Sequence, residues 1–198
     1  MNQFTEKAII LKTIKHMDSN LIVHAINTKG AKLNLFAKAA AKSKKRFGGA
    51  TLEPLNFVQL VYRPGSGEDL DSLGQLSEAT FINGFPKIRT DYDRLELAFY
   101  FVKLILKVAQ ADALDNEPLF NLFGHVLKNL ELSTDLRKLK LQFELKLLAL
   151  QGVLPKLEGA DDLLMAPLAS HSLVELNSDS ILKLQTQVRN VLAEYAEI

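Results

Sequence analysis

NLIVHAINTKGAKLNLFAK, residues 20–38, is the stretch that decides the fold. Two apolar runs, NLIVHAIN and KLNLFAK, flank the turn signal NTKG, in which Gly30 is placed to take a positive φ. The second run alternates apolar and polar residues, the period of a strand with one buried face. The stretch therefore predicts two strands joined by a tight turn.

Three further runs predict strands on either side of this pair. They are AIILKT (8–13), LNFVQLVYR (55–63) and SLGQLSEATFI (72–82). Five short strands in about 80 residues would leave two exposed edges if the sheet stayed open. A small closed barrel of the oligonucleotide-binding (OB) type removes both edges, so we predict a five-stranded OB-fold β-barrel over residues 1–83.

From Thr90 onward the apolar period changes to 3.6, which predicts a helical bundle over residues 84–198. The predicted helices cover residues 91–110, 116–131, 136–150 and 178–194. Asn116, and then Ser178 or Asp179, are candidate N-caps. The predicted fold class is α+β multidomain, an N-terminal OB barrel followed by a C-terminal α-helical bundle with the boundary near residues 83–90.

Composition excludes several kinds of protein and site. Cysteine is absent, which excludes a disulfide framework, a thiol nucleophile and a thiolate metal site. The longest apolar run, LAFYFVKLILKVA, is interrupted by Lys103 and Lys107, and a membrane span needs roughly 20 apolar residues. The four histidines are scattered, and no phosphate-binding or hydrolase motif occurs. We expect a soluble, cytoplasmic, non-enzymatic protein without a cofactor or zinc.

Charge is divided unevenly along the chain. Residues 1–64 hold eleven basic and three acidic residues, a net charge of +8, and the remainder carries −7. Five of the cations lie in KAAAKSKKRFGG, residues 38–49, here called the basic loop. Cations that a fold holds together attract a phosphate chain and release its condensed counterions. The loop therefore indicates a polyanion partner, against the alternative of a solvated connection.

The candidate DNA contacts are the cations of this loop, Lys38, Lys42, Lys44, Lys45 and Arg46. Phe47, which follows them, is either a face on which a base stacks or a core residue. Phe36, Phe57 and Tyr62 on the neighbouring strands leave the same two alternatives open, with the core favoured.

The chain resembles the RecO family of bacterial recombination mediators. Residues 20–63 are similar to the family's long N-terminal block, with a turn at Thr28 to Gly30, then the basic loop, then an L-x-P segment at residues 52–54. FELKLLALQGVLPKL, residues 143–157, is similar to its F-E-x-x-L-L-x-x-x-G-x-x-P signature. Many members place four zinc-binding cysteines after this segment, and this chain has none.

The resemblance implies binding of single- and double-stranded DNA, strand annealing and recombinase loading in DNA repair. It also implies two partners, RecR and the acidic C-terminal tail of the single-stranded-DNA-binding protein, and association with the bacterial nucleoid. Lys103 and Lys107, one turn apart on an apolar helix, are the candidate contacts for the tail.

Three alternatives remain open at the level of sequence. The basic loop could dock an acidic protein, which would make the chain a protein–protein adaptor without DNA affinity at moderate salt. An OB barrel could also bind RNA in preference to DNA. A hydrolase that uses acidic residues at the barrel mouth is the least favoured alternative.

Overall fold

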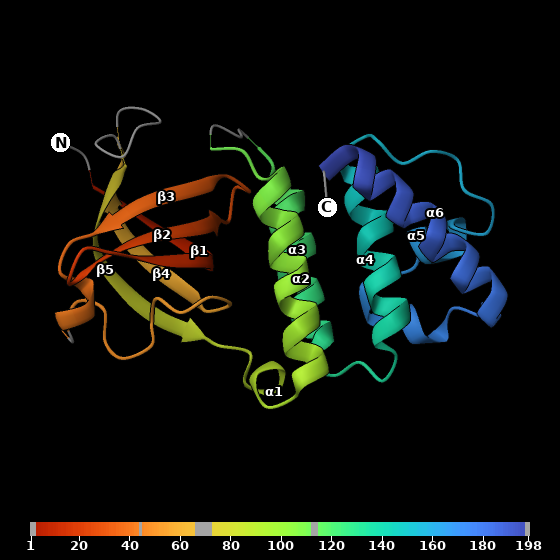
Figure 1. Ribbon diagram of the computed structural model, residues 1–198, viewed down its shortest axis with the longest axis horizontal. Coiled ribbons are helices and arrows are strands. Elements are labelled where there is room, and N and C mark those ends of the chain that lie inside the picture. The colour runs from red at the N-terminus through yellow and green to blue at the C-terminus, as the bar shows by residue number, and fades with distance from the viewer. Residues whose placement is uncertain (1–2, 44, 66–72, 112–114, 197–198) are drawn as a thin grey trace. The chain divides into compact units, whose positions relative to one another are not determined.

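The computed structural model of the chain describes residues 3–43, 45–65, 73–111 and 115–196. The chain packs as two compact units. Unit 1 comprises Met1–Phe85 and Ala109–Phe120, and unit 2 comprises Pro86–Val108 and Asn121–Ile198. The predicted order of a barrel followed by helices is confirmed (Figure 1).

Unit 1 is built around five strands that curl into a closed barrel in the order β1-β2-β3-β5-β4. The strands are β1 (Phe4–His16), β2 (Asn20–Asn27), β3 (Lys32–Ala37), β4 (Phe57–Arg63) and β5 (Gly74–Asn83). All pairs are antiparallel except β3 with β5, which pair in parallel at only two positions. Because β1 pairs with β4 as well as with β2, the sheet has no free edge along β1.

Strand β1 is longer than the run that predicted it. Its first half pairs with β4 and its second half with β2, so one strand of thirteen residues serves two neighbours. A shift of register between Ile10 and Lys12 separates the two halves of its pairing with β2. Such irregularities bend a strand, and a small barrel needs a bent strand to close.

The turn between β2 and β3 is fixed by Gly30, which has the predicted positive φ of 77°. A Cβ at this position would lie 1.9 Å from the backbone oxygen of Asn116, so only glycine fits. The backbone N–H of Asn116 donates to the carbonyl of Lys29 (3.0 Å), and that of Lys32 donates to Gln110 (2.9 Å). Residues 109–120 thus pack with the barrel although they lie within the range predicted for the helical domain.

The barrel core follows the alternation of the strands. Ala8 and Ile10 of β1, Val23 and Ala25 of β2, and Leu35 of β3 are at most 1% exposed and belong to one cluster. Tyr62 closes the cluster near its edge, where its hydroxyl donates to Glu6 Oε2 (2.9 Å). Burial, together with the Glu6 carboxylate, raises the pKa of Tyr62 well above its ordinary value.

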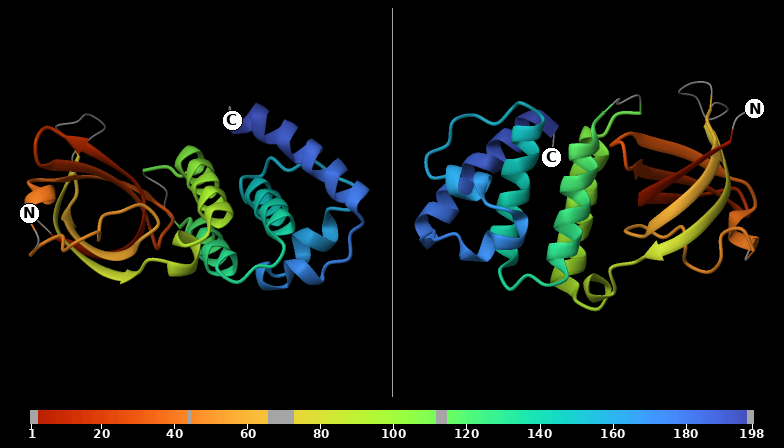
Figure 2. Two further views of the ribbon diagram at one scale, coloured as in Figure 1. Left: turned by 60° about the horizontal axis from the view of Figure 1, so that its bottom comes forward. Right: turned by 180° about the vertical axis from the view of Figure 1, so that it is seen from behind.

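Unit 2 is helical (Figure 2). Its helices are α1 (Pro86–Arg89), α2 (Tyr92–Val108), α3 (Glu117–Leu130, whose first turn belongs to unit 1), α4 (Leu136–Leu150), α5 (Asp161–Met165), the 3-10 helix η3 (Leu168–Leu173) and α6 (Ser178–Ala196). Helix α4 packs against α5, η3 and α6, and Leu139, Phe143 and Leu147 are among its buried residues. Leu141, Leu145 and Leu148 are buried on the opposite side, so α4 is buried on two sides.

Two details of the helical prediction need correction. Neither Ser178 nor Asp179 caps α6. The Asn177 side chain caps it, because its Oδ1 accepts from Ser180 N (2.8 Å). The helix begins at Ser178, so Ser178 and Asp179 lie inside its first turn. The stretch expected to be irregular after residue 155 contains α5 and η3, two elements too short for a visible period.

Candidate nucleic-acid interface

The basic loop leaves the end of β3 and is fastened to the barrel by backbone groups. Ala39 N donates to Asn20 Oδ1 (2.8 Å), and Ala41 N donates to the carbonyl of Ser19 (3.0 Å). Ala79 N of β5 donates to the carbonyl of Arg46 (3.0 Å). The loop, with the 3-10 helix η1 (Ala40–Lys42), is thus tied to the β1–β2 turn at one point and to β5 at another (Figure 1).

Arg46 holds the loop in shape. Its Nη2 donates to the Lys38 carbonyl eight residues earlier (2.8 Å), and its Nε donates to Ser43 Oγ (3.0 Å). The guanidinium also lies 5.0 Å from the centre of the Phe47 ring. Arg46 is half-buried and bonded within the loop, so its main role is to stabilise the loop.

Lys38, Lys42 and Lys45 differ from Arg46 because all three are exposed. Among the described residues, none forms an ion pair with their ammonium groups or accepts a hydrogen bond from them. The fold therefore holds three uncompensated cations on a fixed backbone. Lys44, the fifth predicted contact, lies outside the described residues.

Phe47 lies in the barrel core rather than on the surface. Its ring is 3% exposed and belongs to the same cluster as Ala40 and Leu52. The structure therefore supports the alternative in which Phe47 is a core residue, and it offers no exposed Phe47 ring on which a base could stack. An apolar residue inside a basic run is buried here because the loop covers the space between β3 and β5 beyond their two paired positions.

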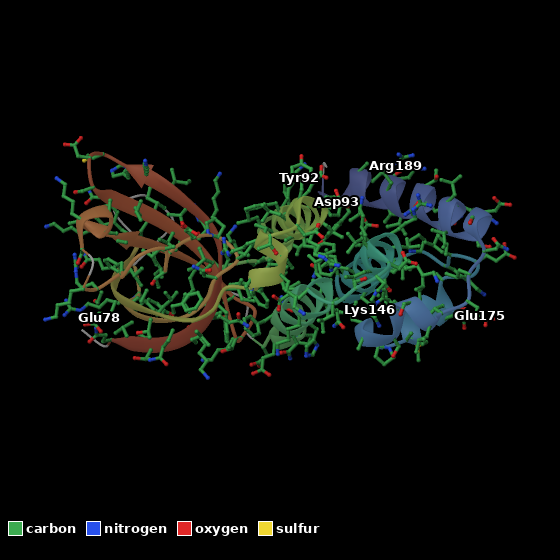
Figure 3. All side chains as sticks on the ribbon, turned by 90° about the horizontal axis from the view of Figure 1, so that it is seen from below. Glu78, Tyr92, Asp93, Lys146, Glu175 and Arg189 are labelled. Atoms are coloured by element: carbon green, nitrogen blue, oxygen red, sulfur yellow. The ribbon has the colours of Figure 1, made fainter. Side chains whose placement is uncertain are left out.

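Carboxylates also lie near the loop, among them Asp18, which precedes the Ser19 that binds Ala41 N. Glu78 of β5 is exposed and precedes Ala79, whose N–H binds the Arg46 carbonyl. Figure 3 shows Glu78 at an end of the barrel from which several nitrogen-tipped side chains project. The exposed lysines of the loop thus have acidic neighbours, Glu78 on β5 and Asp18 in the β1–β2 turn.

A second surface of the barrel escaped the sequence prediction. The register places Lys12, His24 and Asn34 opposite one another across three strands, and Ile14 in the next row opposite Ile22. These residues alternate with the core residues and so face outward. We call this surface, with His16 and Phe36 beside it, the β1–β3 face.

Two contacts organise the β1–β3 face. His24 Nδ1 donates to Asn34 Oδ1 (2.7 Å), and the rings of His16 and Phe36 meet edge to face with centroids 5.9 Å apart. The alternation in KLNLFAK predicted part of this surface, because it placed Asn34 and Phe36 on the same face of the strand. The histidines were not predicted to belong to this surface, because cross-strand neighbours depend on register, which cannot be read from the sequence.

In unit 2, Lys103 and Lys107 are exposed on α2, as predicted. The same helical stripe carries Phe99, which is 45% exposed, and the exposed carboxylate of Glu96. It also carries Tyr92, which is 78% exposed and labelled in Figure 3. Residues four and seven positions apart share a face of a helix. The stripe thus combines aromatic surface with two cations, while Phe101 and the other core-facing residues of α2 are buried.

A serine–histidine pair in unit 2 has the geometry of a nucleophile and its base but not the setting. Ser133 Oγ donates to His171 Nε2 (2.7 Å), and His171 Nδ1 donates to the carbonyl of Leu168 (2.8 Å). Both side chains are 4% exposed, and a backbone carbonyl stands where a triad has a carboxylate. The pair joins η3 to the segment between α3 and α4, which is a structural role.

Neither a metal group nor a membrane helix is found in the described part of the chain. No three His, Cys, Asp or Glu side chains gather there in a way that could hold a metal ion. None of the described helices has both the length and the apolarity that a bilayer crossing demands.

Comparison with known proteins matches two family models to the chain. Residues 1–85 match the N-terminal model of recombination protein O, and residues 89–159 match the C-terminal model. The first match ends where the barrel strands end. The second covers α2, α3 and α4, so α5, η3 and α6 lie beyond it.

Curated relatives agree with the family models. "DNA repair protein RecO" from Desulfatibacillum aliphaticivorans is 35% identical over 159 residues, which are 80% of this chain and 60% of the relative. The proteins of that name from Syntrophus aciditrophicus and Exiguobacterium sp. are 34% and 30% identical over 77% and 76% of this chain. The chain spans 57–60% of the length of these three relatives. Matches that run from the first strand through α4 show that the chain belongs to the RecO family.

Proposed function

We propose that this chain is a DNA-binding mediator of recombinational repair that holds DNA by its phosphates through the basic loop. The observation that carries the proposal is the contrast within the loop, where Arg46 fixes the backbone and three lysines stay exposed and unpaired among the described residues. A pre-shaped cationic loop neutralises phosphates without the cost of ordering itself.

The proposed binding extends to single strands and duplexes and lacks strong sequence preference, because phosphates carry no sequence information. Annealing then follows from electrostatics, since two strands neutralised on one surface repel each other less. Recombinase loading with RecR, and a place at the bacterial nucleoid in the cytoplasm, extend the proposal from the relatives' names and the family. The proposed role is non-enzymatic.

The experiment is a titration of labelled single-stranded and duplex oligonucleotides of unrelated sequence with the parent and with a Lys38→Ala/Lys42→Ala/Lys45→Ala variant. We expect the parent to bind all of them and the variant to bind all of them more weakly by a similar factor. Absence of parent binding at moderate salt, together with a salt-sensitive complex with an acidic protein, would favour the adaptor alternative. Tighter binding of RNA in direct competition would favour the RNA-binding alternative.

A second proposal concerns the partner tail. Phe99 and Tyr92 offer apolar surface beside Lys103 and Lys107, which suits a peptide with apolar and acidic residues. Charge reversal of both lysines is expected to weaken binding of a peptide with the tail's chemistry and to leave the fold and DNA affinity intact. Unchanged peptide affinity would place the tail elsewhere.

We also propose that the protein functions without zinc or another cofactor. The chain has no cysteine, and its four histidines are scattered in the sequence. We expect thermal unfolding to be the same before and after exhaustive chelation. A loss of stability that zinc restores would reveal a site made by other ligands.

A further inference from the structure

One of the points at which the barrel holds the basic loop lies beside Asp18. This residue is exposed in the turn between β1 and β2, and it precedes Ser19, whose carbonyl accepts from Ala41 N (3.0 Å). Lys42, an exposed cation of the loop, follows Ala41. Two backbone segments joined by such a bond lie about 5 Å apart. The hydrogen bond therefore brings the exposed side chains of Asp18 and Lys42 into the same neighbourhood.

Another such point lies beside Glu78. Ala79 N donates to the carbonyl of Arg46 (3.0 Å). Because Ala79 belongs to the barrel core, the alternation of β5 turns the exposed Glu78 outward. Lys45, which is also exposed, precedes Arg46. Glu78 and Lys45 are thus each one residue away from the same hydrogen bond.

Neither carboxylate has a partner that would explain it as part of the fold. Among the described residues, none donates a hydrogen bond to Asp18 or Glu78 or forms an ion pair with them. The residue directly opposite Glu78 on β4 is Val61, which is neutral. Glu6 of β1 differs, because its Oε2 accepts two side-chain hydrogen bonds. The charges of Asp18 and Glu78 are therefore available to act on a ligand of the loop.

The effect of these charges on a bound phosphate is repulsive. Since Lys42 and Lys45 are each one residue from a bond that a carboxylate flanks, a phosphate on either lysine lies within roughly one Debye length of that carboxylate, about 10 Å at 0.1 M salt. Like charges about 8 Å apart in water lower an affinity about twofold for each pair. The repulsion weakens phosphate binding without abolishing it, because the lysines lie nearer to the phosphate.

We propose that Asp18 and Glu78 limit the affinity of the basic loop for DNA, so that a bound strand stays exchangeable and is released to a competing strand. The inference rests on the proposed function, since a carboxylate opposes DNA only where DNA binds. The lysines attract the strand, and the carboxylates set how readily it leaves. A protein that passes DNA on needs both properties.

The test compares the parent with an Asp18→Asn/Glu78→Gln variant, in which amides of the same size replace both carboxylates. We expect the variant to bind single-stranded and duplex oligonucleotides about 3- to 6-fold more tightly at about 0.1 M salt. The gain should shrink as the salt concentration rises, because salt screens the repulsion that the substitutions remove. A labelled strand should also leave the variant more slowly than the parent when excess unlabelled strand is added.

Glu175→Gln/Glu194→Gln is the matched control, because it changes the net charge by the same amount at two exposed positions of the helical unit. Its DNA affinity and its exchange rate should stay close to those of the parent. The single variants Asp18→Asn and Glu78→Gln decide the matter if the double variant does not fold, since each is expected to give a smaller gain in the same direction.

The outcomes separate the inference from the proposed function. If labelled DNA does not bind the parent at all, the proposed function fails. If the parent binds DNA but the Asp18→Asn/Glu78→Gln variant keeps the parent's affinity, or the control gains as much, the inference is overturned and the loop proposal stands. A higher affinity with the parent's exchange rate would show that the carboxylates do not control release, which overturns the inference as well.

Discussion

Two lysines of the helical unit, Lys138 and Lys146, are held by carbonyl groups inside the fold, whereas the three exposed lysines of the basic loop have no such acceptor among the described residues. Lys138 Nζ donates to the carbonyl of Val174 (3.0 Å), and Lys146 Nζ donates to that of Leu164 (2.5 Å). Desolvation by burial also lowers the pKa of Lys146. A lysine whose ammonium group is bound to a carbonyl inside the fold is held in place, and it has fewer N–H donors left for a phosphate.

The difference teaches that a count of basic residues is a poor guide to a binding surface. What matters is whether each cation already forms a hydrogen bond or an ion pair within the fold. Arg46 shows the same point within the loop, since it stabilises the loop while its lysine neighbours remain exposed. Substitution of a cation that is bonded within the fold should therefore lower stability. Substitution of an exposed, unpaired cation should lower DNA affinity instead.

The largest loss of stability is expected at Arg94 of the helical unit, whose guanidinium is held by several acceptors. Its guanidinium donates to the carbonyls of Leu130 and Ser133 and to Asp91 Oδ2 (3.2 Å). Arg94→Ala leaves these acceptors at the end of α3 unsatisfied, so the free energy of unfolding should fall by about 2–3 kcal/mol. Urea unfolding of the parent and of the variant measures this difference in the free energy of unfolding.

Arg94→Lys serves as the control, because an ammonium group cannot span the two carbonyls as the planar guanidinium does. We expect it to recover only part of the stability. DNA affinity should be unchanged in both variants. A drop in DNA affinity with stability intact would show that Arg94 is a ligand contact and would break the comparison.

A smaller loss is expected at Arg46. Arg46→Ala removes the hydrogen bonds to the Lys38 carbonyl and to Ser43, at a cost of about 1 kcal/mol for a partly exposed site. Amide hydrogen exchange in residues 38–47 should accelerate. DNA affinity should also fall, because a loosened loop must be ordered again on binding.

Arg46→Lys separates charge from shape. It keeps the charge but loses the fork that joins Lys38 to Ser43. Fast exchange in Arg46→Lys, close to that of Arg46→Ala, is the expected result. If exchange in Arg46→Lys equals that of the parent, the guanidinium contacts do not hold the loop.

The smallest effect is expected at Lys140 and its partner Glu144, and it is a pH dependence. Glu144 is 5% exposed, accepts from the Tyr100 hydroxyl (2.5 Å) and lies 3.8 Å from Lys140 Nζ. Desolvation raises the pKa of Glu144 above its ordinary value of 4.5, although the Tyr100 bond and Lys140 oppose the rise. The folded state thus holds the proton more tightly than the unfolded state.

The sign follows from this difference in proton binding. Stability from this group is present below about pH 4.5 and declines as the pH rises through the raised pKa of the folded state. Glu144→Gln keeps an acceptor for Tyr100 and should abolish this part of the decline. Urea unfolding of both proteins at several pH values from 4 upward checks it, and parallel curves would contradict it.

The barrel could be predicted closely because strand signals are local. Gly30 marked its turn by residue type, and the alternation in β3 separated core from surface without any knowledge of partners. The cap of α6 was misplaced by one residue, since Asn177, Ser178 and Asp179 are all good caps and only the helix start decides among them.

The candidate site was only half visible in the sequence. Charge clustering identified the basic loop, because neighbours in the chain stay neighbours in a short loop. Whether Arg46 and Phe47 face solvent or the fold depends on β5 and the barrel interior, which lie more than 30 residues away in the case of Ala79. The histidines were considered only as metal ligands, and the contacts of His16 with Phe36 and of His24 with Asn34 were not predicted, because register sets them.

The most direct test of the central claim is the salt dependence of DNA binding in three proteins. The parent is compared with the Lys38→Ala/Lys42→Ala/Lys45→Ala variant and with a control that replaces three exposed lysines of the helical unit. The control residues are Lys87, Lys128 and Lys156.

The loop variant should lose slope in the log–log plot of affinity against salt, by roughly 0.7 per lost contact on single strands and 0.9 on duplex, for two to three contacts. The control should keep the slope of the parent. A loop variant with the parent's affinity and slope, or a control that loses as much as the loop variant, would contradict the claim that the basic loop holds DNA.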